Sequence, residues 1–131
     1  INDFVQKALN ERYIVVYEAD FMRTFIHIHD MARSFIFALE HEGQMAGQVY
    51  NVGSENMNYS KREVCEIIKS KTDCYVHFAE VGQDQDRRNY VVSYEKIRSM
   101  GFQTTVGVGE GIDELIRGFQ VLEHRNPYAN V

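Results

Sequence analysis

Short apolar runs that are typical of β-strands alternate with amphipathic segments that are typical of helices along most of this chain. Residues 13–17, Tyr-Ile-Val-Val-Tyr, form the clearest run, because every side chain in it is β-branched or aromatic. Further strands are predicted at residues 25–28, 48–52 and 75–81, and helices at residues 4–9, 30–39, 60–70, 93–100 and 112–122. The alternation predicts one α/β unit over residues 1–124 and a frayed tail over residues 125–131.

Polar residues indicate where two of these helices begin. Asp30 is expected to cap the helix over residues 30–39, whose inward side chains would be Met31, Phe35, Ile36 and Leu39. Ser60-Lys-Arg-Glu63 has the form of a capping box, in which the serine hydroxyl and the glutamate carboxylate each accept a hydrogen bond from the other residue's backbone N–H. The sequence therefore predicts a helix that starts at Ser60.

The composition excludes several classes of function. The 131 residues are 44% hydrophobic with a net charge of -5, so the chain can form a core but lacks the basic surface that general binding to nucleic acid or membranes requires. No apolar run approaches the roughly 20 residues of a membrane span, and no signal peptide is visible. Cys65 and Cys74 lack CxxC spacing, which favours free buried thiols in a cytoplasmic protein. The first residue is Ile1 rather than methionine, so we expect an excised fragment of a longer protein.

Arginines that neighbour acidic turns are the first candidates for ligand binding. Arg23 precedes a predicted strand, and Arg87 and Arg88 follow a loop that carries Asp84 and Asp86. Guanidinium groups match phosphate oxygens, whereas a carboxylate accepts hydrogen bonds from two ribose hydroxyls, so a pyrophosphate-plus-sugar ligand needs both. The alternative is a set of solvated surface ion pairs.

Two other patterns favour structural interpretations. His27 and His29 would share one side of a strand beside Asp30, but a third metal ligand at suitable spacing is missing, so partly exposed strand histidines are the simpler interpretation. Gly107-Val-Gly-Glu-Gly111 fits neither phosphate-loop motif and is typical of a turn before a helix. Asn51 ends a predicted strand, where either a ligand site or a simple turn is possible. No Tyr-x-x-x-Lys pair and no catalytic triad pattern occurs.

Five ordered motifs resemble the C-terminal portion of the extended short-chain dehydrogenase/reductase family, which contains the NAD-dependent nucleotide-sugar epimerases and dehydratases. The family pattern R-x-F-I-x-V-x-D-x-A is matched over residues 23–32, and V-Y-N-V-G over residues 49–53. The S-x-x-E helix start, the segment D-R-R-x-Y-x-x-S-x-x-K-I and the closing E-G-I-x-E-L correspond to residues 60–63, 86–97 and 110–115. The resemblance extends over about residues 1–120.

The resemblance implies a division of labour. In such enzymes an N-terminal Rossmann domain holds NAD or NADP and the catalytic Tyr-x-x-x-Lys pair, and the C-terminal part grips the nucleoside diphosphate of the sugar substrate. This chain would contain the part that binds the nucleoside diphosphate, would bind no cofactor itself and would be inactive alone. Its parent protein would be a homodimer. Arg23 and Arg87 would contact the pyrophosphate and Asp86 the ribose, with Asn2 and Tyr17 on the phosphate or base side.

The resemblance also implies an edge strand, containing Asn51, and a helix that would belong to the Rossmann sheet of the parent. Two departures stand out: Glu18-Ala-Asp20 follows Tyr17 where the family has V-Y-G-x-G, and Gly109 stands where the family has a helix-opening serine, which is a better cap. The competing hypothesis is a non-catalytic nucleotide-binding or regulatory module that keeps only the fold.

Overall fold

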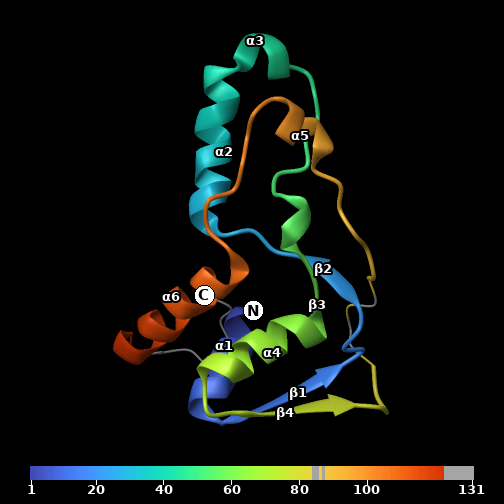
Figure 1. Ribbon diagram of the computed structural model, residues 1–131, viewed down its shortest axis with the longest axis vertical. Coiled ribbons are helices and arrows are strands. Elements are labelled where there is room, and N and C mark those ends of the chain that lie inside the picture. The colour runs from blue at the N-terminus through green and yellow to red at the C-terminus, as the bar shows by residue number, and fades with distance from the viewer. Residues whose placement is uncertain (84–85, 87, 123–131) are drawn as a thin grey trace.

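The fold is a mixed arrangement of helices and short strands, as predicted. The computed structural model describes residues 1–83, 86 and 88–122 (Figure 1). The elements are α1 (Asn2–Asn10), β1 (Tyr13–Tyr17), β2 (Met22–Thr24), α2 (Ile28–Glu40), α3 (Glu42–Met45), a 3-10 turn (Glu55–Met57), β3 (Asn58–Ser60), α4 (Lys61–Lys71), β4 (Tyr75–Ala79), α5 (Glu95–Ser99) and α6 (Val108–Val121).

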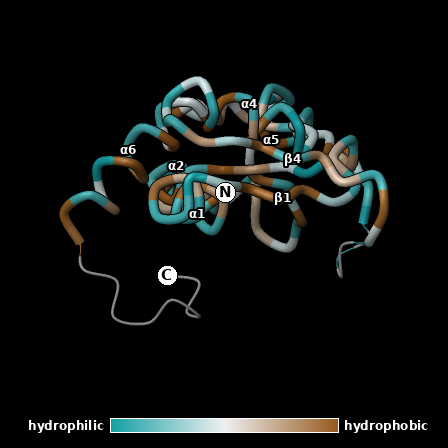
Figure 2. Tube along the Cα trace, turned by 90° about the horizontal axis from the view of Figure 1, so that it is seen from below, coloured by the Kyte–Doolittle hydropathy of each residue, from teal (hydrophilic) through white to brown (hydrophobic). Residues whose placement is uncertain are grey.

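The main core lies against a two-stranded parallel sheet. β1 pairs with β4 from Tyr13 opposite Tyr75 to Tyr17 opposite Ala79, and the two strands run side by side across the molecule in Figure 2. Alternate residues of a strand face opposite sides, so Ile14 and Val16 are buried while their neighbours are exposed. The inner face packs with residues of α1, α4 and α6, namely Val5, Ala8, Val64, Cys65, Ile68, Val108 and Ile112.

The capping box of α4 is confirmed. The Glu63 backbone N–H donates to Ser60 Oγ at 3.1 Å, and the Ser60 N–H donates to Glu63 Oε2 at 2.7 Å. Both cysteines are free and buried, also as predicted, and burial raises the pKa of the Cys65 thiol to about 12. Within the described residues, no helix is long and apolar enough to cross a membrane.

The predicted strand over residues 25–28 is wrong, because α2 already begins at Ile28 and the strand, β2, lies earlier at Met22–Thr24. β2 pairs antiparallel with β3. The N-cap of α2 is His27, whose ring Nδ1 accepts a hydrogen bond from the His29 backbone N–H at 3.2 Å. Asp30 is therefore not the cap, although it lies in the first turn.

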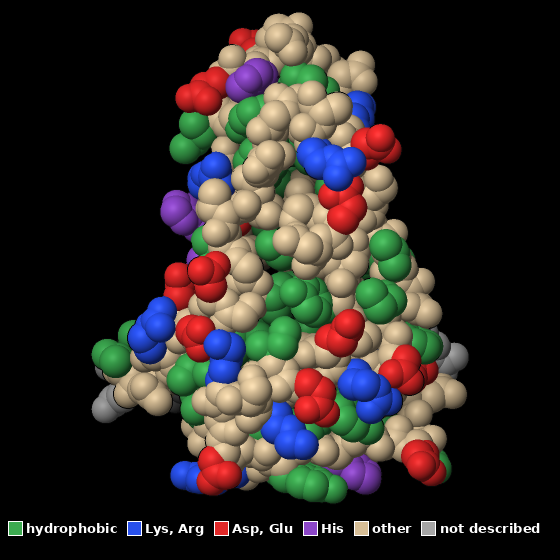
Figure 3. All heavy atoms as spheres, in the orientation of Figure 1, with side chains coloured by type: hydrophobic (Ala, Val, Ile, Leu, Met, Phe, Trp, Pro, Cys, Tyr) green, Lys and Arg blue, Asp and Glu red, His purple; other side chains and the backbone are tan. Residues whose placement is uncertain are grey.

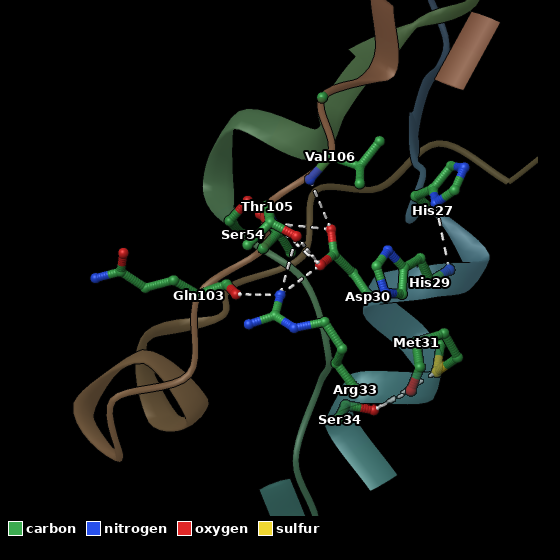
Figure 4. A network of polar contacts seen from close by, with 12 residues as sticks. His27, His29, Asp30, Met31, Arg33, Ser34, Ser54, Gln103, Thr105 and Val106 are labelled. Carbon is green, nitrogen blue, oxygen red and sulfur yellow. Dashed lines mark hydrogen bonds and ion pairs between the residues drawn. The ribbon is translucent and has the colours of Figure 1, made fainter. Parts of the chain in front are cut away.

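Asp30 instead joins α2 to the segment that precedes α6. Its fully buried carboxylate accepts hydrogen bonds from the backbone N–H groups of Thr105 and Val106, from the Thr105 hydroxyl and from Arg33 Nη1, all at 2.7–3.0 Å (Figure 4). Burial alone raises the pKa of a carboxyl, but these hydrogen bonds outweigh it and hold the pKa of Asp30 below its ordinary value. The carboxylate is thus ionised, buried and fully partnered.

The orientation of α2 also differs from the prediction. Its buried residues are Asp30 and Ser34, whereas Phe35 is 67% exposed and Leu39 77% exposed, and Ile36 is exposed as well. The polar residues face inward because Asp30 and Arg33 bind the segment 103–106, which leaves the apolar side facing out. Of the predicted inward set, only Met31 is partly buried.

Residues 48–52 form no strand among the described residues, which corrects the third predicted strand. A strand is defined by its ladder partner, and here side chains hold the segment instead: Lys96 Nζ donates to the Val49 carbonyl at 2.8 Å, and Asn51 Nδ2 donates to the Ser93 carbonyl at 3.2 Å. A second apolar cluster lies beside it, formed by Tyr94, Ile97 and Phe102.

The remaining boundaries shift by small amounts. β4 ends at Ala79, and the N-cap position of α5 is Tyr94, one residue after the predicted Ser93. α6 starts at Val108 after the cap residue Gly107, so Gly109 is inside the helix and does not act as its cap. The Gly107 N–H donates to Glu110 Oε2 at 2.9 Å, which satisfies one of the free donors of the first turn.

We predict that Asp30→Asn destabilises the fold by about 2–4 kcal/mol, because an amide accepts fewer hydrogen bonds and turns an N–H₂ group toward buried donors. Urea unfolding of purified chains measures the difference. Asp73→Asn is the matched control, since Asp73 is exposed and pairs only on the surface with Arg12; its cost should stay below about 1 kcal/mol.

The wild-type chain and the Asp30→Asn variant can also be compared at different pH values. Because the folded pKa of Asp30 is lowered, its ionised form contributes stability above the unfolded pKa of about 3.9, and this contribution disappears as the pH falls through the folded pKa. The difference in free energy of unfolding between wild type and Asp30→Asn should therefore be constant near neutral pH and become smaller in acid. A gap that is independent of pH down to complete acid unfolding would contradict an ionised Asp30.

Candidate functional site

Arg23 and Asp86 lie together, although 62 residues separate them in the chain. Arg23 extends from β2, and its side chain is only 11% exposed. Its Nη1 donates to the Met22 carbonyl and its Nη2 to the Asp86 carbonyl, both at 2.8 Å, and Nη2 is 3.5 Å from Asp86 Oδ1. Backbone carbonyls thus fix the plane of a partly buried guanidinium, which is the preorganisation that an anion site requires.

Arg88 adds a second guanidinium to this pair. The carboxylate of Asp86 accepts from Arg88 Nε and Nη2, each at 2.7 Å, and from the Arg88 backbone N–H at 3.2 Å. The hydrogen bond from the Arg88 side chain is the main reason that the pKa of Asp86 lies well below its ordinary value. Two arginines around one ionised carboxylate leave a net positive cluster, which suits an anionic ligand.

Aromatic and amide side chains surround Arg23 on the same side. The Arg23 guanidinium carbon lies 5.7 Å from the centroid of the Tyr90 ring. The Met22 backbone N–H donates to Asn89 Oδ1 at 2.8 Å, and the side-chain amide of Asn58 exchanges two hydrogen bonds of 3.0 Å with the backbone of Val92. Residues 88–92 therefore lie against β2 and β3 without forming a strand.

Tyr17 contributes to the site by packing. It ends β1, and its ring lies against Gly82, whose φ of +116° belongs to the backbone region that favours glycine. A Cβ atom on Gly82 would lie 2.4 Å from Tyr17 Cε1. The contact fixes the turn at the start of the segment that carries Asp86.

Asn2 lies in a different place from Arg23. It is the first residue of α1 and lines a pocket of about 1180 Å³ between the start of α1, residues 24–28 and α6. Most lining side chains are apolar, and neither Arg23 nor Asp86 lines it. Arg87 lies outside the described residues. Of the five residues proposed from sequence to bind substrate, the structure brings together Arg23 and Asp86, and it places the Tyr17 ring against Gly82.

His27 has a structural role that the sequence did not reveal. Besides capping α2, its ring Nε2 lies 3.0 Å from Glu114 Oε2 of α6, at the wall of the same pocket. His27 and His29 do not share one side of a strand, because α2 begins between them. Among the described residues, no three His, Cys, Asp or Glu side chains are placed to hold a metal ion.

The sequence motif pointed to part of the remaining cluster. Arg88, Asn89 and Tyr90 all lie in the segment Asp86-Arg-Arg-Asn-Tyr90. Arg88 was one of the arginines considered for ligand binding, but the resemblance assigned ligand contacts in this segment only to Asp86 and Arg87. Asn58 carried no signal, because its partner Val92 is 34 residues away. On the face shown in Figure 3, charged side chains of both signs are mixed, so that face carries no basic patch.

Comparison with known proteins connects this geometry to a family. Residues 1–53 match the model of the NAD dependent epimerase/dehydratase family. The fold is similar to that of Thermus thermophilus UDP-glucose 4-epimerase, solved with NAD (TM-score 0.72, 21% identity, 90% of this chain and 39% of that chain). It is also similar to Bacillus anthracis dTDP-glucose 4,6-dehydratase, solved with NAD (TM-score 0.71, 23% identity, 89% and 37%).

The predicted resemblance to a portion of an extended short-chain dehydrogenase/reductase is therefore confirmed, as is the α/β fold class. An uncharacterized Schizosaccharomyces pombe protein is 24% identical over 140 residues, which cover 88% of this chain and 37% of that protein. The chain thus spans between 37% and 39% of the length of these relatives. The edge strand that the resemblance implies around Asn51 is not present, since residues 48–52 form no strand among the described residues.

The Tyr17–Gly82 contact predicts the effect of a small substitution. Gly82→Ala should destabilise the fold by about 1–3 kcal/mol, since it combines an unfavourable φ with a clash against the Tyr17 ring. Urea unfolding measures the loss. Gly43→Ala is the control, because Gly43 lies in α3 with open space around its Cα; it should be neutral or stabilise by up to about 1 kcal/mol. Equal effects of the two changes would contradict the contact.

Proposed function

We propose that this chain is the substrate-binding part of an NAD(P)-dependent nucleotide-sugar epimerase or dehydratase, and that it grips the nucleoside diphosphate. The observation that carries the proposal is the cluster of Arg23, Asp86 and Arg88, which gathers an oriented guanidinium, an ionised carboxylate and a second guanidinium. Both arginines lie in segments that match the family motifs, residues 23–32 and 86–97. The names of the two solved relatives add support, because both contain a nucleotide sugar.

Arg23 is the proposed anchor for the pyrophosphate. A guanidinium has five N–H donors, so the two bonds to backbone carbonyls orient the group while further donors can meet phosphate oxygens. Because the side chain is mostly buried, the attraction is less screened than at an exposed arginine. Arg87 is proposed as the second pyrophosphate contact from the motif alone.

Asp86 is the proposed partner of the ribose. Its pairing with Arg88 keeps the carboxylate ionised, and a carboxylate with two oxygens accepts from two adjacent hydroxyls. Tyr17 and Asn2 take lesser roles in the proposal, on the phosphate or base side. Tyr17 supports the loop of Asp86, whereas Asn2 would reach the ligand only where it extends into the pocket beside α1.

The chemistry itself belongs to the remainder of the protein in this proposal. The sequence of this chain contains neither a Tyr-x-x-x-Lys pair nor a glycine-rich dinucleotide loop, and we propose that the cofactor is held by another part of the protein. Binding energy from the phosphates would position the sugar for a reaction carried out elsewhere. We also propose that the complete protein is a cytoplasmic homodimer.

Replacing Arg23 tests the grip. Arg23→Ala in the complete protein should weaken binding of UDP-glucose, dTDP-glucose or GDP-mannose by about 1.5–3 kcal/mol, because charge-assisted hydrogen bonds to phosphate are lost. Isothermal titration calorimetry measures the affinities. Arg12→Ala is the control, since Arg12 pairs with Asp73 on the surface. An unchanged affinity of the Arg23 variant for every ligand would remove Arg23 from the site.

The isolated chain should show no turnover. With NAD or NADP and each of the three nucleotide sugars, the purified 131-residue chain is expected to give no change in nicotinamide absorbance and no new sugar product by chromatography. Measurable turnover would contradict the proposed division of labour. Absence of both the glycine-rich loop and the Tyr-x-x-x-Lys pair from the complete protein would favour a non-catalytic binding module instead.

A further inference from the structure

Two asparagine side chains hold residues 89–92 against the β2–β3 pair. Asn58, the first residue of β3, donates through Nδ2 to the Val92 carbonyl and accepts at Oδ1 from the Val92 N–H, each at 3.0 Å. At the other end of the segment, Asn89 Oδ1 accepts from the Met22 N–H at 2.8 Å. The segment is therefore fixed at both ends by amide groups instead of a strand ladder.

The chemistry of the side-chain amide explains why asparagine is needed at position 58. A carboxamide carries a donor and an acceptor in one plane, so it can meet both the N–H and the C=O of one residue in the way that a neighbouring strand would. Asn58 Nδ2 also donates to the Glu55 carbonyl at 3.2 Å, which ties the amide to the turn before β3. Aspartate would keep the acceptor but lose both donated bonds.

The clamped segment forms one side of the Arg23 site. Met22 makes three hydrogen bonds there. Its backbone N–H donates to Asn89 Oδ1, and its carbonyl accepts from Arg23 Nη1 at 2.8 Å and from the Tyr90 N–H at 3.5 Å. The Tyr90 ring lies beside the Arg23 guanidinium. A shift of residues 89–92 would therefore move the Tyr90 ring and break two hydrogen bonds to Met22, whose carbonyl is one of the two that orient Arg23.

We propose that Asn58 and Asn89 are positioning residues of the anion site. They set the orientation of the Arg23 guanidinium by fixing Tyr90 and Met22 around it, and they act on the ligand only through Arg23. The inference rests on the proposed function, since it assigns Arg23 to the phosphates. The alternative is that the two amides contribute to folding stability alone.

A double-mutant cycle on ligand affinity separates these roles. The variants are Asn58→Ala, Arg23→Ala and the double variant in the complete protein, with UDP, GDP, CDP and dTDP as the titrated ligands. Asn58→Ala should weaken binding of the preferred nucleotide about tenfold in the wild-type background and less than about twofold in the Arg23→Ala background, because a positioning residue has nothing left to position. Thermal unfolding should show the same loss of stability in both backgrounds.

Three further proteins keep the test decisive. Asn58→Asp removes only the donor half of the clamp, and Asn89→Ala releases the other end, so either can replace Asn58→Ala if that variant does not fold. Asn10→Ala is the control, because Asn10 is an exposed asparagine at the end of α1. It should leave affinity unchanged.

The outcomes that overturn the inference are distinct from failure of the proposed function. If Arg23→Ala weakens binding while the clamp variants do not, or if the clamp variants weaken binding by the same factor in both backgrounds, Asn58 and Asn89 do not act through Arg23. If Arg23→Ala itself binds every nucleotide normally, the proposed function fails and the positioning role fails with it.

Discussion

The parallel pairing of β1 with β4 is the constraint on which the rest of the structure depends. Parallel neighbours cannot be joined by a tight turn, so residues 18–74 must leave the end of β1 and return to the start of β4. That crossover contains β2, α2, β3 and α4. The carboxyl ends of both strands then lie side by side, and the segment after β4 passes the end of β1, where Gly82 meets the Tyr17 ring. Asp86 reaches Arg23 as a consequence.

A second constraint explains the unusual orientation of α2. The buried carboxylate of Asp30 accepts hydrogen bonds from two consecutive backbone N–H groups of the segment before α6. The polar side of α2 therefore faces that segment. A fully partnered buried charge cannot be turned to solvent without losing all of these bonds, whereas exposed apolar side chains cost less. The apolar side of α2, with Phe35, Ile36 and Leu39, is thereby exposed.

Local patterns were sufficient wherever the interacting residues were close in sequence. The strand over residues 13–17 and the capping box of Ser60 and Glu63 were predicted correctly, because β-branched composition and reciprocal capping act within a few residues. The same logic failed at Asp30, where an acidic residue near a helix start suggested a cap. Its partners, Thr105 and Val106, are 75 and 76 residues away, so a pattern of neighbouring residues cannot predict them.

The sequence by itself determined which chemical groups are present: an arginine beside an acidic turn, a segment rich in arginine and aspartate, and a set of motifs that resemble one enzyme family. Only the tertiary structure decided which of these groups meet. It placed Arg23 against Asp86 and Tyr90, left Asn2 in a separate pocket, and gave Asn58 a place in the site through a contact with Val92. The physical reason is that the type of each side chain specifies what it can bind, whereas the crossover between the parallel strands sets how far apart these side chains lie, and hydrogen bonds form only over short distances.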